Sequence, residues 1–130
     1  MTITELMSRP EISIKIKTSY IEDQSAPENR RFVFAYTITI HNDGEVPARL
    51  ISRHWVITDA TGKKQEVQGL GVVGEQPYLR PGEGFQYTSG TVLETPVGSM
   101  EGTYQMVTDG GDEFNAIIPA FTLHVPKALH

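Results

Sequence analysis

A glycine-rich segment, Gly69–Gly74, carries the pattern with the clearest potential for chemistry, because it spells G-x-G-x-x-G. In dinucleotide-binding proteins this fingerprint brings backbone N–H groups close to a pyrophosphate, with a strand before it and a helix N-terminus after it. Here Pro77, Pro81 and Gly82 follow within a few residues, and they argue against a helix. We therefore predict that the glycines lie in a loop of a β protein.

Two interpretations of this loop remain open. In the first, the backbone amides of Gly69, Gly71 and Gly74 form a concave anion site, with Arg80 as an assisting cation. In the second, the glycines only provide the positive φ angles of a tight connection. A G-x-G-x-x-G pattern outside a strand–helix unit is weak evidence for a ligand, so the second interpretation is favoured.

The tripeptide Arg53-His54-Trp55 is the second candidate for chemistry. Alternate side chains of a strand share a face, so Arg53 faces inward if Trp55 does, and His54 faces outward. An inward Arg needs a carboxylate or carbonyl partner, which favours a structural role, although Arg53 and Lys64 could also assist an anion site. His54 has no recognisable nucleophile or orienting acid, so we predict no catalytic residue.

The sequence predicts no metal site and no cofactor. The four histidines are not at ligand spacing; they are His41, His54, His124 and His130. The acidic turn Asp109–Glu113 lacks the ordered oxygen ligands of a calcium loop. No nucleophile motif such as G-x-S-x-G occurs, and an enzyme is therefore the function class that we rank lowest.

The composition fits one small domain. The chain has 130 residues, no cysteine and a net charge of −5, so disulfides and thiolate zinc sites are excluded. The negative charge argues against general nucleic-acid binding. Residues 1–10 contain no apolar stretch typical of a signal peptide, and no run approaches the length of a membrane span. These features predict a soluble, cytoplasmic protein that does not enter a membrane.

The elements that position these residues are β-strands, because the dominant hydrophobic period is two. The alternating segments are residues 12–17, 32–41, 49–58, 64–68, 85–88 with a bent continuation over 91–93, 100–106, 114–118 and 121–125. Turn residues separate them, as Asn42-Asp43-Gly44 shows. No convincing helix is found. About eight short strands at this spacing predict an antiparallel sandwich or barrel.

Two details favour an all-β, immunoglobulin- or fibronectin type III-like sandwich of seven to eight strands. Trp55 lies on the third strand, where such folds bury a Trp, and Ile51 and Arg53 are expected on its face. The segment Gly102–Met106 resembles a tyrosine corner, with Met106 in the place of the second Cys. We predict a single domain over residues 1–130, with short flexible tails at about 1–11 and 126–130.

Several long blocks in the same order carry a specific family resemblance. They are Arg53–Ala60, Gly69–Pro77, Leu79–Glu83, Tyr87–Gly90, Thr95–Met106, Phe114 and Ile118–Phe121. Over nearly its whole length the chain resembles the bacterial ApaG family.

The resemblance implies a fibronectin type III-like fold and leaves the biochemical role open. Similar domains form the C-terminal part of certain F-box proteins and of a DNA polymerase delta interacting protein, which implies a protein-binding module. The family is associated with cobalt and magnesium efflux, and for this chain such a link to Co²⁺ and Mg²⁺ homeostasis would be indirect. Its genes lie beside a diadenosine tetraphosphatase, which keeps a nucleotide ligand under consideration.

Our first hypothesis is therefore a non-catalytic module that binds a protein partner through the loops Gly69–Glu83 and Glu94–Ser99. The alternative is a binder of a phosphorylated small molecule, a nucleotide or pyrophosphate, through Gly69–Gly74. Lysines on the strand Ile12–Lys17 guard against edge pairing, which favours a monomer or a weak homodimer.

Overall fold

The computed structural model describes residues 10–126, and it consists of eight strands and two short 3-10 turns. The strands are β1 (Ile12–Tyr20), β2 (Phe32–Asn42), β3 (Ala48–Asp59), β4 (Lys64–Leu70), β5 (Tyr78–Leu79), β6 (Gly84–Leu93), β7 (Val97–Thr108) and β8 (Glu113–His124). The 3-10 turns, Glu22–Gln24 and Pro27–Asn29, join β1 to β2. Most residues of the predicted tails, His130 among them, lie outside the described residues.

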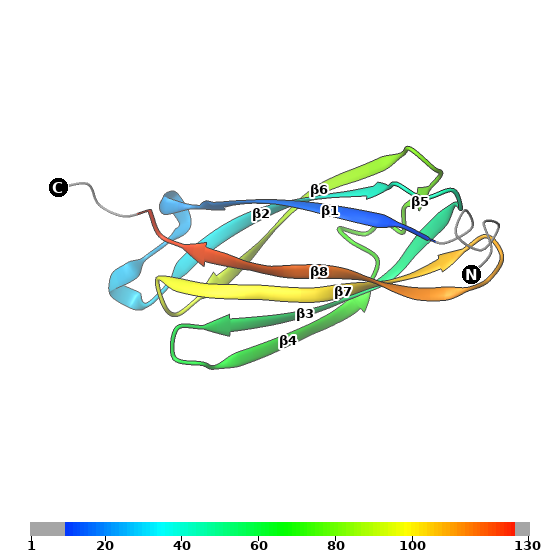
Figure 1. The fold of residues 1–130 in the computed structure, drawn as a ribbon. Helices are drawn as coiled ribbons and strands as arrows, with labels where there is room; N and C mark the ends of the chain where they lie inside the picture. Colours follow the sequence, from blue (N-terminus) through cyan, green and yellow to red (C-terminus); the bar gives the residue numbers. More distant parts are fainter. Residues whose placement is uncertain (1–9, 127–130) are drawn as a thin grey trace.

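The strands form two antiparallel sheets that pack face to face (Figure 1). The first sheet has the order β1-β2-β6, and the second has the order β4-β3-β7-β8, with β5 paired to the start of β3. The predicted β-sandwich is therefore confirmed.

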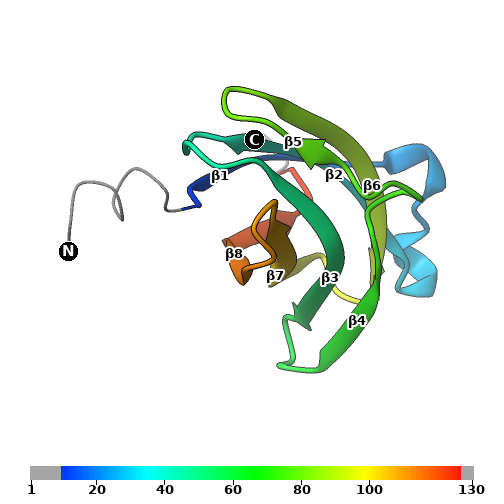
Figure 2. The same cartoon turned by 90° about the vertical axis from the view of Figure 1, so that its right-hand side faces the viewer.

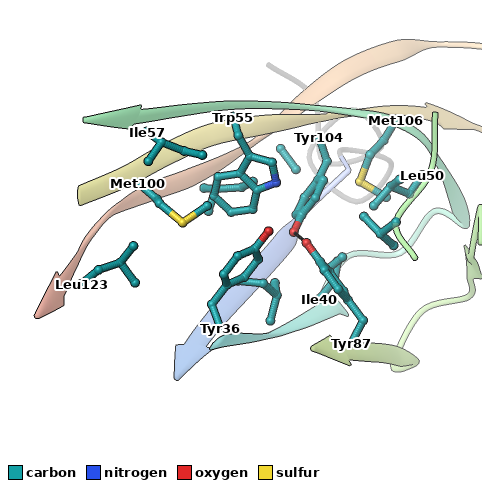
Figure 3. Packing of buried hydrophobic residues seen from close by; sticks show 14 of the residues in the cluster. Tyr36, Ile40, Leu50, Trp55, Ile57, Tyr87, Met100, Tyr104, Met106 and Leu123 are labelled. Carbon is teal, nitrogen blue, oxygen red and sulfur yellow. Dashed lines mark hydrogen bonds between the residues drawn. The ribbon is translucent and has the colours of Figure 1, made fainter. Parts of the chain in front are cut away.

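Alternating side chains of the two sheets build the core between them, as the sequence predicts. Phe34, Ile38 and Ile40 point inward from β2 and are almost fully buried. Trp55 of β3 and Tyr104 of β7 meet them from the second sheet, with the Trp55 side chain only 2% exposed (Figure 3). The expected burial of Trp55 is confirmed.

The prediction that Ile51 shares the face of Trp55 is wrong. The pairing of β3 with β7 shifts register between Leu50 and Ser52, so Ile51 is an extra residue at a bulge. Leu50 is fully buried in its place, whereas Ile51 is half-buried. A bulge moves the alternation by one position, and nothing within the β3 sequence marks its place.

Three boundaries also differ from the prediction. The segments 114–118 and 121–125 form one strand, β8; its pairing with β7 skips Pro119, which lacks an N–H to donate. Gly90 pairs with Ala35 without a register shift, so 85–88 and 91–93 belong to one continuous strand, β6. The expected loop Glu94–Ser99 ends early, because β7 begins at Val97.

Tyr104 does not form a tyrosine corner. Such a corner needs a Tyr near the start of its strand, bonded to the backbone of the preceding turn. Tyr104 lies well inside β7, and its hydroxyl is hydrogen-bonded to the Tyr87 hydroxyl of β6, across the sandwich (Figure 3). Met106 is buried, which agrees with its expected place in the core.

The chain crosses between the sheets along one side of the sandwich. Figure 2 shows it leaving β4, running beside β6 and reaching β5. The crossing segment, residues 71–77, contains the second and third glycines of the motif. This side therefore brings the glycine motif over the gap between the two sheets.

Candidate functional site

The glycine motif forms a tight, internally bonded loop. Gly71 and Gly74 have φ angles of 62° and 81°, and Val73 between them has a φ of 43°. The backbone N–H groups of Val72 and Glu75 each donate to the other's carbonyl oxygen, both at 2.8 Å. Positive φ is the region that Gly enters without strain, so two of the three glycines are explained by backbone shape.

Gly71 is also required by a close backbone contact, whereas Gly69 lies against the end of a long side chain. A Cβ at Gly69 would lie 2.7 Å from Nη1 of Arg53, its partner across the strand pair, and a Cβ at Gly71 would lie 2.3 Å from the Glu75 carbonyl oxygen. The Gly71 N–H donates to the Ile51 carbonyl oxygen at 2.8 Å. That amide is therefore already used in holding the loop to β3.

Arg53 is the cation that the fold places beside the glycines. Its Nη1 donates to the carbonyl oxygens of Leu70 and Gly71, both at 3.0 Å. The expectation that an inward Arg needs a carbonyl or carboxylate partner is confirmed. Arg53 therefore holds the end of β4 and the start of the loop in place through these two hydrogen bonds.

The two other predicted cations lie elsewhere. Arg80 follows β5 with an exposed side chain, and its backbone N–H donates to the Glu83 carboxylate at 2.8 Å. Lys64 begins β4, about 20 Å along the strand from Leu70. The structure thus brings Gly69, Gly71, Gly74 and Arg53 together, and it does not bring Arg80 or Lys64 to them.

A cavity of 270 Å³ lies under the loop, at the open side of the sandwich. Its lining residues are Tyr36, Arg53, Trp55, Leu70, Val72, Val73, Gly74, Tyr87 and Ser89. None of them is a carboxylate, and Arg53 is the one charged group. The cavity therefore has one cation and a mainly polar lining.

Three tyrosines and Trp55 converge behind this cavity (Figure 3). The hydroxyls of Tyr87 and Tyr104 are hydrogen-bonded to each other, and the Tyr36 ring lies 5.5 Å from that of Trp55. Burial raises the pKa of Tyr87 to about 12, and it raises the pKa of Tyr104 further above its ordinary value. Both phenols are therefore neutral hydrogen-bonding groups at pH 7.

The buried Nε1 of Trp55 has no hydrogen-bond acceptor among the described residues. Figure 3 shows that the edge of the indole that carries Nε1 faces the tyrosine hydroxyls. Buried polar groups nearly always have a hydrogen-bond partner, so the unpaired indole N–H of Trp55 is an unusual feature beside the cavity.

Sequence reasoning did not identify Tyr36, Tyr87 or Ser89 as site residues. A signal was present, because strand alternation places all three on inward faces of β2 and β6. What the sequence does not show is that the glycine loop crosses above these strands.

The loop also exposes two large apolar side chains, which sequence reasoning did not single out. Leu70 is 76% exposed and Val73 is 56% exposed. They flank buried Val72 at the end of β4, which is a free edge of the five-stranded sheet. We call Leu70, Val73 and the free edge of β4 the glycine-loop surface.

Two of the histidines pair with carboxylates outside the cavity. His41 pairs with Asp43, and His54 pairs with Glu66 at 3.3 Å. Within residues 10–126, no three His, Cys, Asp or Glu side chains are grouped so that they could hold a metal ion. In the same range, no helical segment has the length and apolar character needed to cross a bilayer.

Comparison with known sequences identifies a family. The model of the ApaG domain matches residues 22–108. A protein ApaG of Thiobacillus denitrificans is 62% identical over 120 residues, which cover 92% of this chain and 94% of the relative. A protein ApaG of Pseudomonas aeruginosa is 59% identical over 120 residues, with 92% and 95% covered.

A solved structure supports the same conclusion. The crystal structure of a Bordetella pertussis protein described as ApaA superposes with a TM-score of 0.90 at 47% identity, covering 94% of this chain and 99% of that chain. The shared fold therefore extends over almost the whole molecule.

Proposed function

This chain belongs to the ApaG domain family, and we propose that it is a non-catalytic module that binds another protein through the glycine-loop surface. The observation that carries the proposal is the exposure of Leu70 and Val73, at 76% and 56%, beside a free strand edge. Exposed apolar groups at a rimmed surface are typical of interaction sites.

The hydrogen bonds that hold the glycine loop in place also support the proposal. Arg53 and the carbonyl of Ile51 hold the loop on one side, and the bridge between Val72 and Glu75 closes it. Leu70 and Val73 are therefore presented on a fixed backbone. A pre-ordered surface loses little conformational entropy when a partner binds.

Binding of a phosphorylated molecule by the loop amides has less support. The Gly71 N–H already donates to Ile51, and Arg80 lies away from the glycines. An enzymatic role has no support in the arrangement of titratable groups described above. A cytoplasmic location and an indirect link to Co²⁺ and Mg²⁺ homeostasis remain compatible parts of the proposal.

The test is affinity capture with three forms of the protein. Leu70→Ser/Val73→Ser removes the apolar tip, and Ile117→Ser is the matched control, because Ile117 is 74% exposed on β8, at the opposite edge of the sheet. A Leu or Val anchor that becomes buried contributes about 1.5–3 kcal/mol. We expect a partner that the native chain and Ile117→Ser retain and that the double variant binds at least 10-fold more weakly, measured again with the purified partner.

Equal binding of that partner by all three forms would contradict the proposal for this surface. Thermal unfolding should be unchanged in both variants, because substitutions at such exposed positions shift stability by only about 0.5 kcal/mol.

A further inference from the structure

The cavity under the glycine loop has features that protein binding at the exposed tip does not explain. The polar side chains that line it are those of Arg53, Tyr36, Tyr87 and Ser89; the Nε1 of Trp55 is itself fully buried. All of these can donate a hydrogen bond, and no lining carboxylate neutralises Arg53. A ligand that suits this lining supplies acceptor atoms and one negative charge.

Arg53 offers a defined geometry for such a ligand. Its Nη1 is bonded to the carbonyl oxygens of Leu70 and Gly71. The Nε and Nη2 edge makes no hydrogen bond to the described residues. That edge carries two parallel N–H donors, which match the two oxygens of a carboxylate in a bidentate pair.

Two tyrosines line the same cavity as Arg53. Trp55 Nε1 is buried without an acceptor and faces the Tyr36 and Tyr87 hydroxyls (Figure 3). The Arg53 charge lowers the pKa values of Tyr87 and Tyr104, although burial has the larger, opposite effect. The guanidinium therefore interacts electrostatically with these two hydroxyls. Arg53, Tyr36 and Tyr87 therefore border one cavity.

We propose that this cavity binds the carboxylate group of a small organic acid, with Arg53 as its ion-pair partner and the Tyr36 hydroxyl as a further donor. A single guanidinium matches the single charge of a carboxylate, whereas a phosphate dianion requires more cations. Leu70 and Val72 provide apolar walls for a short hydrocarbon stem. The volume of 270 Å³ far exceeds the roughly 10–15 Å³ that one water needs, and it is enough for a short-chain acid.

The chain contains its own reporter, because Trp55 is its only tryptophan. We would follow the single indole N–H signal in ¹H–¹⁵N spectra during titration with sodium acetate and sodium butyrate. Sodium chloride of equal ionic strength and inorganic phosphate serve as comparison arms. We expect a saturable shift with both acids, and butyrate should bind about 15-fold more tightly, since it has two more methylenes and each buried methylene is worth about fourfold.

Two variants assign the donors. Arg53→Lys keeps the charge and loses the planar fork, so the affinity should fall at least 10-fold. Tyr36→Phe removes one hydroxyl and no intramolecular hydrogen bond of the described structure, so it should fold normally and bind about threefold to 10-fold more weakly. Lys64→Ala, a cation removed at the far end of β4, should bind like the native chain.

The proposal is overturned if acetate and butyrate shift the indole signal no more than chloride does, because the cavity then holds water only. It is also overturned if phosphate binds more tightly than butyrate, or if Tyr36→Phe and Arg53→Lys both bind with native affinity. The inference does not depend on a protein partner, so equal capture of a partner by the native chain, Ile117→Ser and Leu70→Ser/Val73→Ser would leave it intact.

Discussion

At the scale of single residues, the fold explains the glycine motif without a ligand. Gly69 leaves space for the Arg53 guanidinium, Gly71 combines a φ of 62° with a close carbonyl, and Gly74 has a φ of 81°. The motif is known for phosphate binding. In this fold it allows a tight turn of the chain next to Arg53.

The first stability prediction concerns Gly71. An added Cβ meets the Glu75 carbonyl oxygen at 2.3 Å and places an Ala at positive φ, so Gly71→Ala should lower the free energy of unfolding by about 2–3 kcal/mol. Gly62 has a φ of 90° with no atom near its Cβ position, so Gly62→Ala should cost only about 1 kcal/mol. Urea unfolding of both variants measures the difference, and equal losses would refute the importance of the carbonyl contact.

The tyrosine pair gives a prediction of pH dependence. The pKa of Tyr87 is raised to about 12 from an ordinary 10.0, and that of Tyr104 is raised as well. Between pH 10 and 12 the unfolded chain therefore loses protons that the folded chain keeps, so stability is retained below pH 10 and falls as the pH rises above it.

Urea midpoints measured from pH 8 to 11.5 test this sign. The native chain should lose stability steeply above pH 10, by up to about 1.4 kcal/mol per pH unit for each tyrosine. The double variant Tyr87→Phe/Tyr104→Phe should show a shallower decline. Tyr20→Phe, which removes a half-buried tyrosine outside the pair, should follow the native curve.

Residue-level prediction from the sequence succeeded where local chemistry decided the outcome. The inward direction of Trp55 and the carbonyl partner of Arg53 follow from alternation and from the cost of an unpaired charge. The place of Arg80 could not be predicted, because the pairing of β5 with β3 determines it. A two-residue strand leaves almost no periodic signal.

At the scale of elements, the alternating pattern predicts most strands and their faces, but it does not predict how neighbours pair. The bulge at Ile51 and the skipped pairing at Pro119 both depend on β7. Each belongs to two strands at once, and therefore no single segment of sequence encodes it.

Gly102 shows how closely β7 and β3 approach. It pairs with Trp55, and a Cβ at Gly102 would lie 2.1 Å from the His54 carbonyl oxygen. Gly102→Ala should therefore force the strands apart and cost about 3 kcal/mol or more. Gly110→Ala is the control, since its added Cβ has no neighbour closer than 3.8 Å. A native-like melting temperature for Gly102→Ala would contradict the close approach.

At the scale of the whole molecule, the two sides of the sandwich differ in what covers the gap between the sheets. On one side β1 contacts β8, whereas on the other side the chain between β4 and β6 spans the gap and roofs the cavity. The sequence predicts the sandwich, its strands and its family resemblance. It does not predict the cavity, because residues from β2, β3, β6 and the loop meet there only in the folded molecule.

The pairing of β3 with β7 also affects the order in which the protein can fold during synthesis. Ala48 pairs with Thr108 and Asp59 pairs with Gly98, so β3 gains its central neighbour only after most of the chain has left the ribosome. Until then the hairpin of β3 and β4 exposes the indole of Trp55 and an open strand edge. Such long-range pairing is slow and leaves nascent chains prone to aggregation, and we expect this hairpin to be the segment that a ribosome-associated chaperone holds.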